Sequence, residues 1–233
     1  MQAIDGLIKD VENICLSYLT KEEQIYIKKE WSKFNKDKVC NIAAENGWLD
    51  LLMWGEINGC RWDSFTCSYA ALNGHLEVLK WARSKPNGCE WYSTTCSYAA
   101  LNGHLEVLKW ARENGCDWDS NTCSYAAEKG QLEVLKWARE NGCYWNSYTC
   151  SNAAKNGHLE VLKWARQNGC DWDSSTCSYA AGNGHLEVLK WVVQNGCEWN
   201  SFTCKWAAEN GHLEVLKWAK LNGCVCGGKY HKD

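Results

Sequence analysis

The residues of this chain that could carry chemistry are its cysteines and histidines, and almost all of them recur at fixed intervals. Fourteen of the sixteen cysteines form two series, and each series advances by 27 residues with a single step of 29. The first series is Cys40, Cys67, Cys96, Cys123, Cys150, Cys177 and Cys204, and the second is Cys60, Cys89, Cys116, Cys143, Cys170, Cys197 and Cys224. Cys15 and Cys226 fall outside both series.

This regularity argues against a metal centre and against catalysis. The chain has no Cys-x-x-Cys pair, and the repeated histidine is Gln131 in one copy and Trp48 in another. Zinc ligands do not tolerate such replacement, and a catalytic site needs one unique constellation, whereas here every His–Cys neighbourhood is copied. We therefore predict no metal, no cofactor and no catalytic residue. The cysteines are expected to be buried thiols of a reducing compartment, the cytoplasm.

The elements that must position these residues repeat as well. The string Gly-His-Leu-Glu-Val-Leu-Lys-Trp starts at Gly74, Gly103, Gly157, Gly184 and Gly211, with a variant at Gly130 and a degraded copy at Gly47. A period of this size is typical of a solenoid, in which each unit buries its apolar face against its neighbours.

One unit, taken from about residue 64 to 90, predicts two short helices. Ser64 is expected to cap a helix over about 65–72, Asn73-Gly74 to end it, and a second helix to cover about 75–83. A Cys-x-Trp loop follows, and no room is left for a substantial β-hairpin. In the 29-residue unit Pro86 must end the second helix, so a local loop bulge is expected there.

The predicted fold is thus an all-α solenoid of seven helix pairs over residues 39–224, with β-hairpins shortened or absent. A different segment, 1–38, precedes it, and a polar tail, 225–233, follows. The net charge of −3 gives no sign of a phosphate-binding surface, so we expect no nucleic acid. No apolar run is long enough to span a membrane.

The first helix of each unit has one constant and one changing face. Cys67, Ala70 and Ala71 form a stripe of small residues that hardly changes between copies, and the opposite positions change in every copy. The two tryptophan series are invariant and are expected to belong to the core. The changing face predicts partner binding, although its residues could instead be unconstrained, with tyrosines stacking on their neighbours. The predicted binding residues are Phe65, Tyr69, Leu72, Tyr98, Leu101, Tyr125, Tyr148, Tyr179, Phe202 and Trp206.

The stretch from Ala126 to Lys136, followed by Asn141-Gly142-Cys143, resembles an ankyrin repeat. The unit is shorter than the roughly 33 residues of that family, and Thr-Cys-Ser-Tyr replaces its Thr-Pro-Leu-His signature in most copies. Short Cys- and Trp-rich units of this kind resemble ankyrin-type repeats of giant viruses of amoebae. The resemblance implies binding of a protein through a concave face of first helices, without catalysis, and a host-cytoplasmic location if the chain is viral.

Residues 1–38 lack the repeat and show helical apolar spacing. The run from Val11 to Thr20, with Trp31-Ser32-Lys33-Phe34, resembles an F-box, although the usual Leu-Pro opening is absent. That resemblance implies docking to the linker subunit of a cullin-type ubiquitin ligase. The alternative is a helical cap over the first repeat. The candidate docking residues are Val11, Ile14, Leu16, Leu19, Trp31 and Phe34.

The last unit keeps the sequence of an internal repeat. It has Leu213, Leu216 and Trp218 at the positions that carry leucine and tryptophan in repeats followed by another repeat, but only a polar tail follows it. We expect a monomer whose last unit frays or, less readily, pairs with a second molecule. Cys224 and Cys226 are then predicted to be the most exposed thiols.

Overall fold

The structure is a computed structural model that describes residues 20–22, 25, 36–57, 59–60, 63–85 and 88–224. These residues form fourteen helices and no strand, which confirms the all-α prediction and the absence of hairpins over the described ranges. The chain divides into two compact units, Met1–Thr95 and Cys96–Asp233, and each is described by itself. The F-box-like residues lie outside the described ranges, and so do Pro86 and its predicted bulge.

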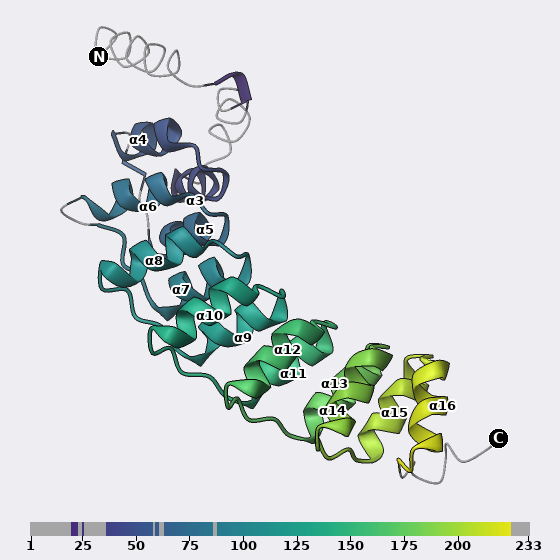
Figure 1. The fold of residues 1–233 in the computed structure, drawn as a ribbon. Helices are drawn as coiled ribbons and strands as arrows, with labels where there is room; N and C mark the ends of the chain where they lie inside the picture. The colour runs from purple at the N-terminus through teal and green to yellow at the C-terminus, as the bar shows by residue number, and fades with distance from the viewer. Residues whose placement is uncertain are drawn as a thin grey trace, which may run out of the picture. The chain divides into compact units, whose positions relative to one another are not determined.

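The helices come in pairs that follow the repeat (Figure 1). The predicted boundary at residue 39 falls inside the first of them. In chain order the helices are α3 (Lys36–Asn46), α4 (Leu49–Ile57), α5 (Ser64–Leu72), α6 (Leu76–Arg83), α7 (Ser93–Leu101), α8 (Leu105–Glu113), α9 (Ser120–Glu128), α10 (Leu132–Glu140), α11 (Ser147–Lys155), α12 (Leu159–Gln167), α13 (Ser174–Gly182), α14 (Leu186–Gln194), α15 (Ser201–Glu209) and α16 (Leu213–Leu221).

The first helices start one residue earlier than the sequence predicted. The serines expected to cap them are their first helical residues, and the cap is the preceding Asp or Asn. Asp63 accepts hydrogen bonds from the amides of Phe65 and Thr66 at 2.9 and 3.3 Å. The prediction was wrong because a carboxylate or amide oxygen at this earlier position reaches the unpaired amides of the first turn.

Glycines end both helices of a pair, as predicted for the first helix. Gly157 and Gly169, for example, have φ angles of +77° and +83°, in the left-handed region that favours glycine. The chain can therefore reverse within two residues after each helix, which keeps the unit short.

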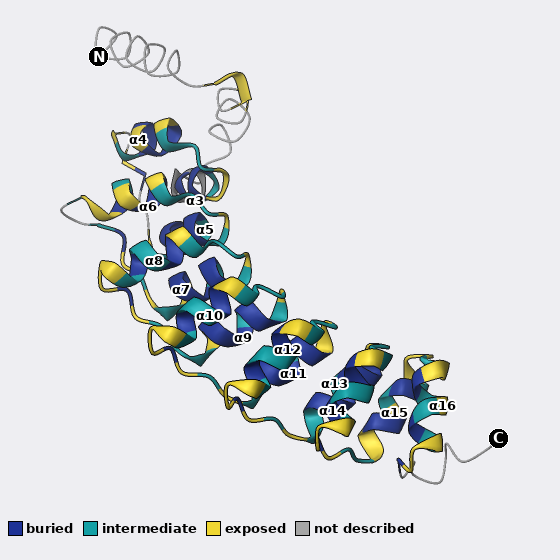
Figure 2. Ribbon diagram, in the orientation of Figure 1, coloured by how far each residue is buried: buried dark blue, intermediate teal, exposed yellow. Residues whose placement is uncertain are grey.

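The core is built from small residues of the first helices and aliphatic residues of the second (Figure 2). Cys123, Ala126 and Ala127 of α9 are fully buried, and so are the equivalent residues of α11 and α13. This small-residue stripe lets α9, α11, α13 and α15 pack successively on one another. Leu135 and Leu162 of the second helices are also fully buried, and each such leucine contributes about 1.5–3 kcal/mol.

The cysteines lie in the core as predicted, but they are not all thiols. Two disulfides join Cys40 to Cys60 and Cys67 to Cys89, and Cys204 is also disulfide-bonded. The prediction of thiols is confirmed for the remaining described cysteines, which are reduced and buried. It was wrong for the disulfide-bonded cysteines, because the argument considered the reducing compartment and the packing of thiols in the core. It did not consider that a cysteine of the first series lies close to one of the second.

The last repeat differs partly from its prediction. Leu213 and Leu221 of α16 are exposed, and Leu216 is half-buried where the equivalent leucines of inner repeats are fully buried. Cys224, however, is only 6 % exposed. This is still the highest exposure among the described thiols, as predicted, but the loop after α16 folds Cys224 against Cys204 and Ala219 and keeps it buried.

Candidate interaction surface

The predicted binding residues occupy three positions of the first helices, and the first of these positions is the most exposed. It lies in the first turn, directly after the serine that begins each helix. In the second unit Tyr148 and Phe202 are 64 % and 49 % exposed there, and in the first unit Phe65 is 58 % exposed. These aromatic rings are held by a capped helix end, since the amides of Tyr148 and Phe202 donate to Asn146 and Asn200 at 3.1 and 2.9 Å.

The middle position is half-buried, and its residues contact their neighbours. Tyr179 and Trp206 of successive first helices stack with ring centroids 5.4 Å apart, and Phe202 lies 5.9 Å from Trp206. Tyr69 stacks on Phe65 at 6.2 Å in the first unit. Tyr98 and Tyr125 are half-buried in the same way. The alternative left open by the sequence, tyrosine stacking on its neighbour, therefore holds for Tyr179.

At the third position, the size of the residue depends on the side chains packed around it. Leu72 and Leu101 are half-buried. Gly182 is buried, and a Cβ atom built there would lie 3.0 Å from the Cβ of Trp206. A small residue on one helix thus makes room for a large one on the next, which places Trp206 partly in a packing role.

Two exposed aromatic residues were missed by the sequence argument. Tyr144 is 79 % exposed in the Cys-x-Trp loop, and Tyr92 is 54 % exposed at the position where other first helices carry their Asp or Asn cap. The signal was available for Tyr144, because Glu90, Asp117 and Glu198 show that acidic residues usually occupy its position.

The repeated histidines join neighbouring repeats. Nε2 of His158 lies 3.0 Å from the carbonyl oxygen of Glu128, and that of His185 lies 3.0 Å from the carbonyl oxygen of Lys155. Since a carbonyl can only accept, Nε2 carries the proton and donates. Each ring also lies over the glycine of the preceding repeat, and Gln131 takes the same place over Gly103. A long polar side chain of either kind can fill the role, which explains why the position tolerates glutamine.

The second helices carry a charged ridge. Lys136 pairs with Glu133 at 2.8 Å and Lys163 with Glu160 at 2.8 Å, and the glutamates are about three-quarters exposed. Such pairs contribute little to stability because water screens them, so the ridge is a solvated surface.

The tryptophans are not core residues, which corrects the prediction. Among the described tryptophans only Trp54 is buried, and the others are half-buried. Loop tryptophans meet the second-helix tryptophan of the next repeat edge to face. The centroid distances are 5.8 Å for Trp118–Trp137 and Trp145–Trp164, and 5.7 Å for Trp172–Trp191 and Trp199–Trp218. Outside Trp54, the indole rings pack against one another at the edge of the core rather than within it.

In most repeats of the second unit, an arginine guanidinium lies over the ring of the loop tryptophan. The guanidinium of Arg112 lies 4.2 Å from the Trp118 ring, and that of Arg139 lies 4.5 Å from the Trp145 ring. Arg139 also donates to the carbonyl oxygen of Cys143 at 3.1 Å. A cleft of about 480 Å³ opens beside the first of these stacks; it is lined by Lys109, Arg112, Glu113, Trp118, Trp137 and Asn141.

Over the described residues, no cluster of three or more His, Cys, Asp or Glu side chains could hold a metal ion. None of the helices in those ranges is long and apolar enough to cross a bilayer.

Comparison with known families agrees with the geometry. Residues 150–227 match the family model for ankyrin repeats, in three copies. This stretch covers α11 to α16, whose helix pairs have the same form as those of the other repeats. No curated protein matches the chain significantly. The family match and the repeated helix pairs together support an ankyrin-type repeat protein, and ankyrin repeats generally mediate protein–protein interaction.

Proposed function

We propose that this chain is a scaffold that binds a protein partner along the exposed faces of its first helices. The observation that carries the proposal is the exposure of Tyr148 and Phe202 at the same position of two capped first helices, α11 and α15. Aromatic residues held on a rigid backbone lose little entropy on binding and are frequent anchors of protein interfaces.

The surroundings of these anchors differ from repeat to repeat. Asn121 and Ser175 occupy the anchor position on α9 and α13, so polar residues separate the aromatic ones. Lys155 on α11 and Glu209 on α15 are exposed at the third position and add charges of opposite sign. This pattern suits a partner that presents spaced apolar groups and polar groups between them.

The test is to select ligands for the full-length chain from a peptide display library and to measure their affinity for variants. We expect Tyr148→Ala and Phe202→Ala to weaken binding at least about tenfold each, as truncated anchors do. Tyr144→Ala is the matched control, because it removes a still more exposed tyrosine that belongs to a loop and not to a first helix. Ligands that tolerate both helix variants, or that lose as much affinity with the control, would argue against this surface.

An adaptor role in ubiquitination would add ligase docking through residues 1–38 to the same scaffold. Its support is the F-box-like pattern between Val11 and Phe34. Affinity capture with the full chain and with a chain that lacks residues 1–38 tests it. Recovery of cullin components that depends on this segment favours the adaptor, and recovery of none from either chain excludes it.

A further inference from the structure

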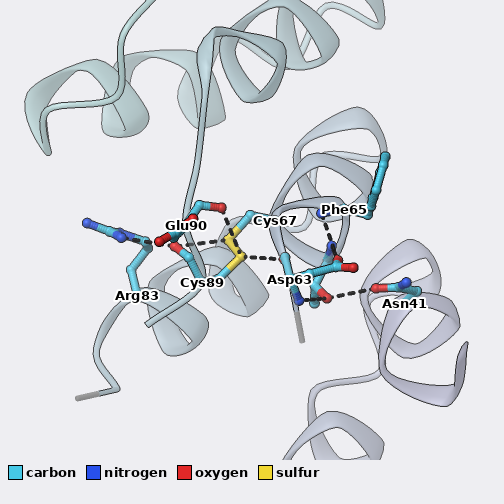
Figure 3. The surroundings of a disulfide bond; sticks show 8 residues. Asn41, Asp63, Phe65, Cys67, Arg83, Cys89 and Glu90 are labelled. Atoms are coloured by element: carbon cyan, nitrogen blue, oxygen red, sulfur yellow. Dashed lines mark hydrogen bonds between the residues drawn. A yellow bond between two sulfur atoms is a disulfide. The ribbon is translucent and has the colours of Figure 1, made fainter. Parts of the chain in front are cut away.

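Every described repeat pairs a cysteine of its first helix with a cysteine of its loop. In the first unit two of these pairs are disulfides, with Cα atoms 6.5 Å apart in Cys40–Cys60 and 6.2 Å apart in Cys67–Cys89. Both distances lie within the usual range for disulfides. Figure 3 shows the second bond, which links α5 to the loop after α6; Arg83 donates to the carbonyl oxygen of Cys89 at 2.9 Å.

The second unit contains four pairs at the same positions in the reduced form. They are Cys96 with Cys116, Cys123 with Cys143, Cys150 with Cys170, and Cys177 with Cys197. In two of them the helix thiol donates to the carbonyl oxygen of the loop cysteine, at 4.0 Å from Cys150 to Cys170 and at 3.7 Å from Cys177 to Cys197.

The backbone positions the disulfide-bonded cysteine pairs and the reduced cysteine pairs in the same way. The amide of the loop cysteine donates to a carbonyl of the second helix, at 2.8 Å for Cys60 and 2.9 Å for Cys143. On the first helix, Cys67 of a disulfide and Cys123 of a reduced pair are each the fourth residue of their helix. A bond between the reduced thiols therefore requires a change of side-chain torsion and no rearrangement of the repeat.

The two thiols of a reduced pair differ in acidity. The hydrogen bond from Cys123 lowers the pKa of Cys143, although burial acts in the opposite direction. The same hydrogen bond, followed by burial, raises the pKa of Cys123. Cys143 also lies between exposed Gly142 and exposed Tyr144, whereas Cys123 lies within a helix. Both thiols are fully buried, but the loop cysteine has the lower pKa and exposed neighbours in the chain, so it is the better nucleophile.

We propose that the four reduced pairs between Cys96 and Cys197 are oxidation sites, which close to disulfides with the connectivity already present in the first unit. The oxidant is a hydroperoxide. The loop thiolate attacks the peroxide, the O–O bond breaks, and the departing oxygen takes a proton, which leaves a sulfenic acid on the loop cysteine. The helix thiol then attacks that sulfur, and the S–O bond breaks with release of water. Each pair gives up two electrons and two protons; the peroxide is reduced to an alcohol, or to water if it is hydrogen peroxide, and the second step releases one molecule of water.

Each new bond would tie a first helix to the loop that follows its partner helix, and so close a ring around one repeat. The seventh repeat stands outside the proposal, because Cys204 is already disulfide-bonded while Cys224 is a thiol. Closing such rings restricts the unfolded chain, so oxidation is expected to raise Tm by about 5 °C or more.

The experiment treats the native full-length chain, in which the four pairs between Cys96 and Cys197 are thiols, with hydrogen peroxide and maps cross-linked peptides by mass spectrometry without reduction. We expect Cys123–Cys143, Cys150–Cys170 and the other two within-repeat links, together with the higher Tm. Links between different repeats, or links that form only after denaturation, would overturn the proposal.

Single substitutions test the assigned roles. Cys123→Ser leaves Cys143 without its resolving partner, so a sulfenic acid should accumulate there and react with dimedone. Cys143→Ser leaves Cys123, which should stay unlabelled. Ser at residue 143 can still donate to the carbonyl oxygen of Asp119, as the thiol does at 3.3 Å. Equal labelling of the two variants would contradict the assignment of the loop cysteine as the nucleophile, and the cross-link map of the unsubstituted chain stands independently of either variant.

Discussion

Replacing Gly157 by alanine should be far more damaging than the same change at Gly169. Both glycines have positive φ angles, +77° and +83°, so each alanine pays the same backbone cost of about 1–2 kcal/mol. A Cβ at Gly157 would lie 2.8 Å from two ring atoms of His185, whereas a Cβ at Gly169 would meet nothing within 4 Å. The pair therefore separates the backbone cost from the cost of disturbing the contact between repeats.

The extra cost at Gly157 follows from the position of the histidine ring. To make room, the ring must leave the carbonyl oxygen of Lys155, to which it donates at 3.0 Å. Losing that hydrogen bond costs about 0.5–1.5 kcal/mol, and forcing an atom into packed surroundings costs about 1–3 kcal/mol. We expect Gly157→Ala to lower the free energy of unfolding by about 3–6 kcal/mol, against about 1–2 kcal/mol for Gly169→Ala.

Thermal and urea denaturation of the two variants measure this difference, which corresponds to a Tm gap of about 5–15 °C. A double variant, Gly157→Ala with His185→Ala, removes the ring, so the alanine at 157 should then cost no more than the one at 169. Equal losses for the two single variants, or strictly additive effects in the double variant, would refute the argument.

The remaining predictions concern caps and core. Tyr92→Asn supplies α7 with the kind of cap that other first helices have, and should raise Tm by about 2–4 °C in differential scanning calorimetry. The pKa of Asp173 is lowered chiefly by the hydrogen bond from the Ser175 hydroxyl, so its stabilising effect is present above the unfolded pKa of about 4 and is lost as the pH falls through the lower folded value. Asp173→Asn keeps the cap and should flatten the fall of Tm measured between about pH 5 and 3; an unchanged slope would contradict this. Leu162→Ala should cost about 2–5 kcal/mol in urea denaturation, and Leu216→Ala, at a half-buried position, clearly less; equal costs would show that the last repeat is as well packed as the inner ones.

The candidate surface was predictable only in part. The contrast between the constant Cys-Ala-Ala stripe and the changing opposite positions was enough to place Tyr148 and Phe202 on an exposed face. It could not separate them from Trp206, because the space that Trp206 fills is created by Gly182 one repeat earlier. Tyr144 was missed because only the first helices were compared for variation, and the loops were treated as packing elements.

The sequence by itself determined the features that depend on local geometry. Helical apolar spacing, the Asn-Gly pairs and the 27-residue period define the helix pairs, because helix periodicity and glycine's access to positive φ act within a few residues. Only the tertiary structure decided which groups meet between elements: the histidine over the preceding glycine, the edge-to-face tryptophans and the paired cysteines. These contacts depend on how far one helix advances and turns relative to the next, and that offset is set by the packing of whole side chains rather than by the order of residues along one helix.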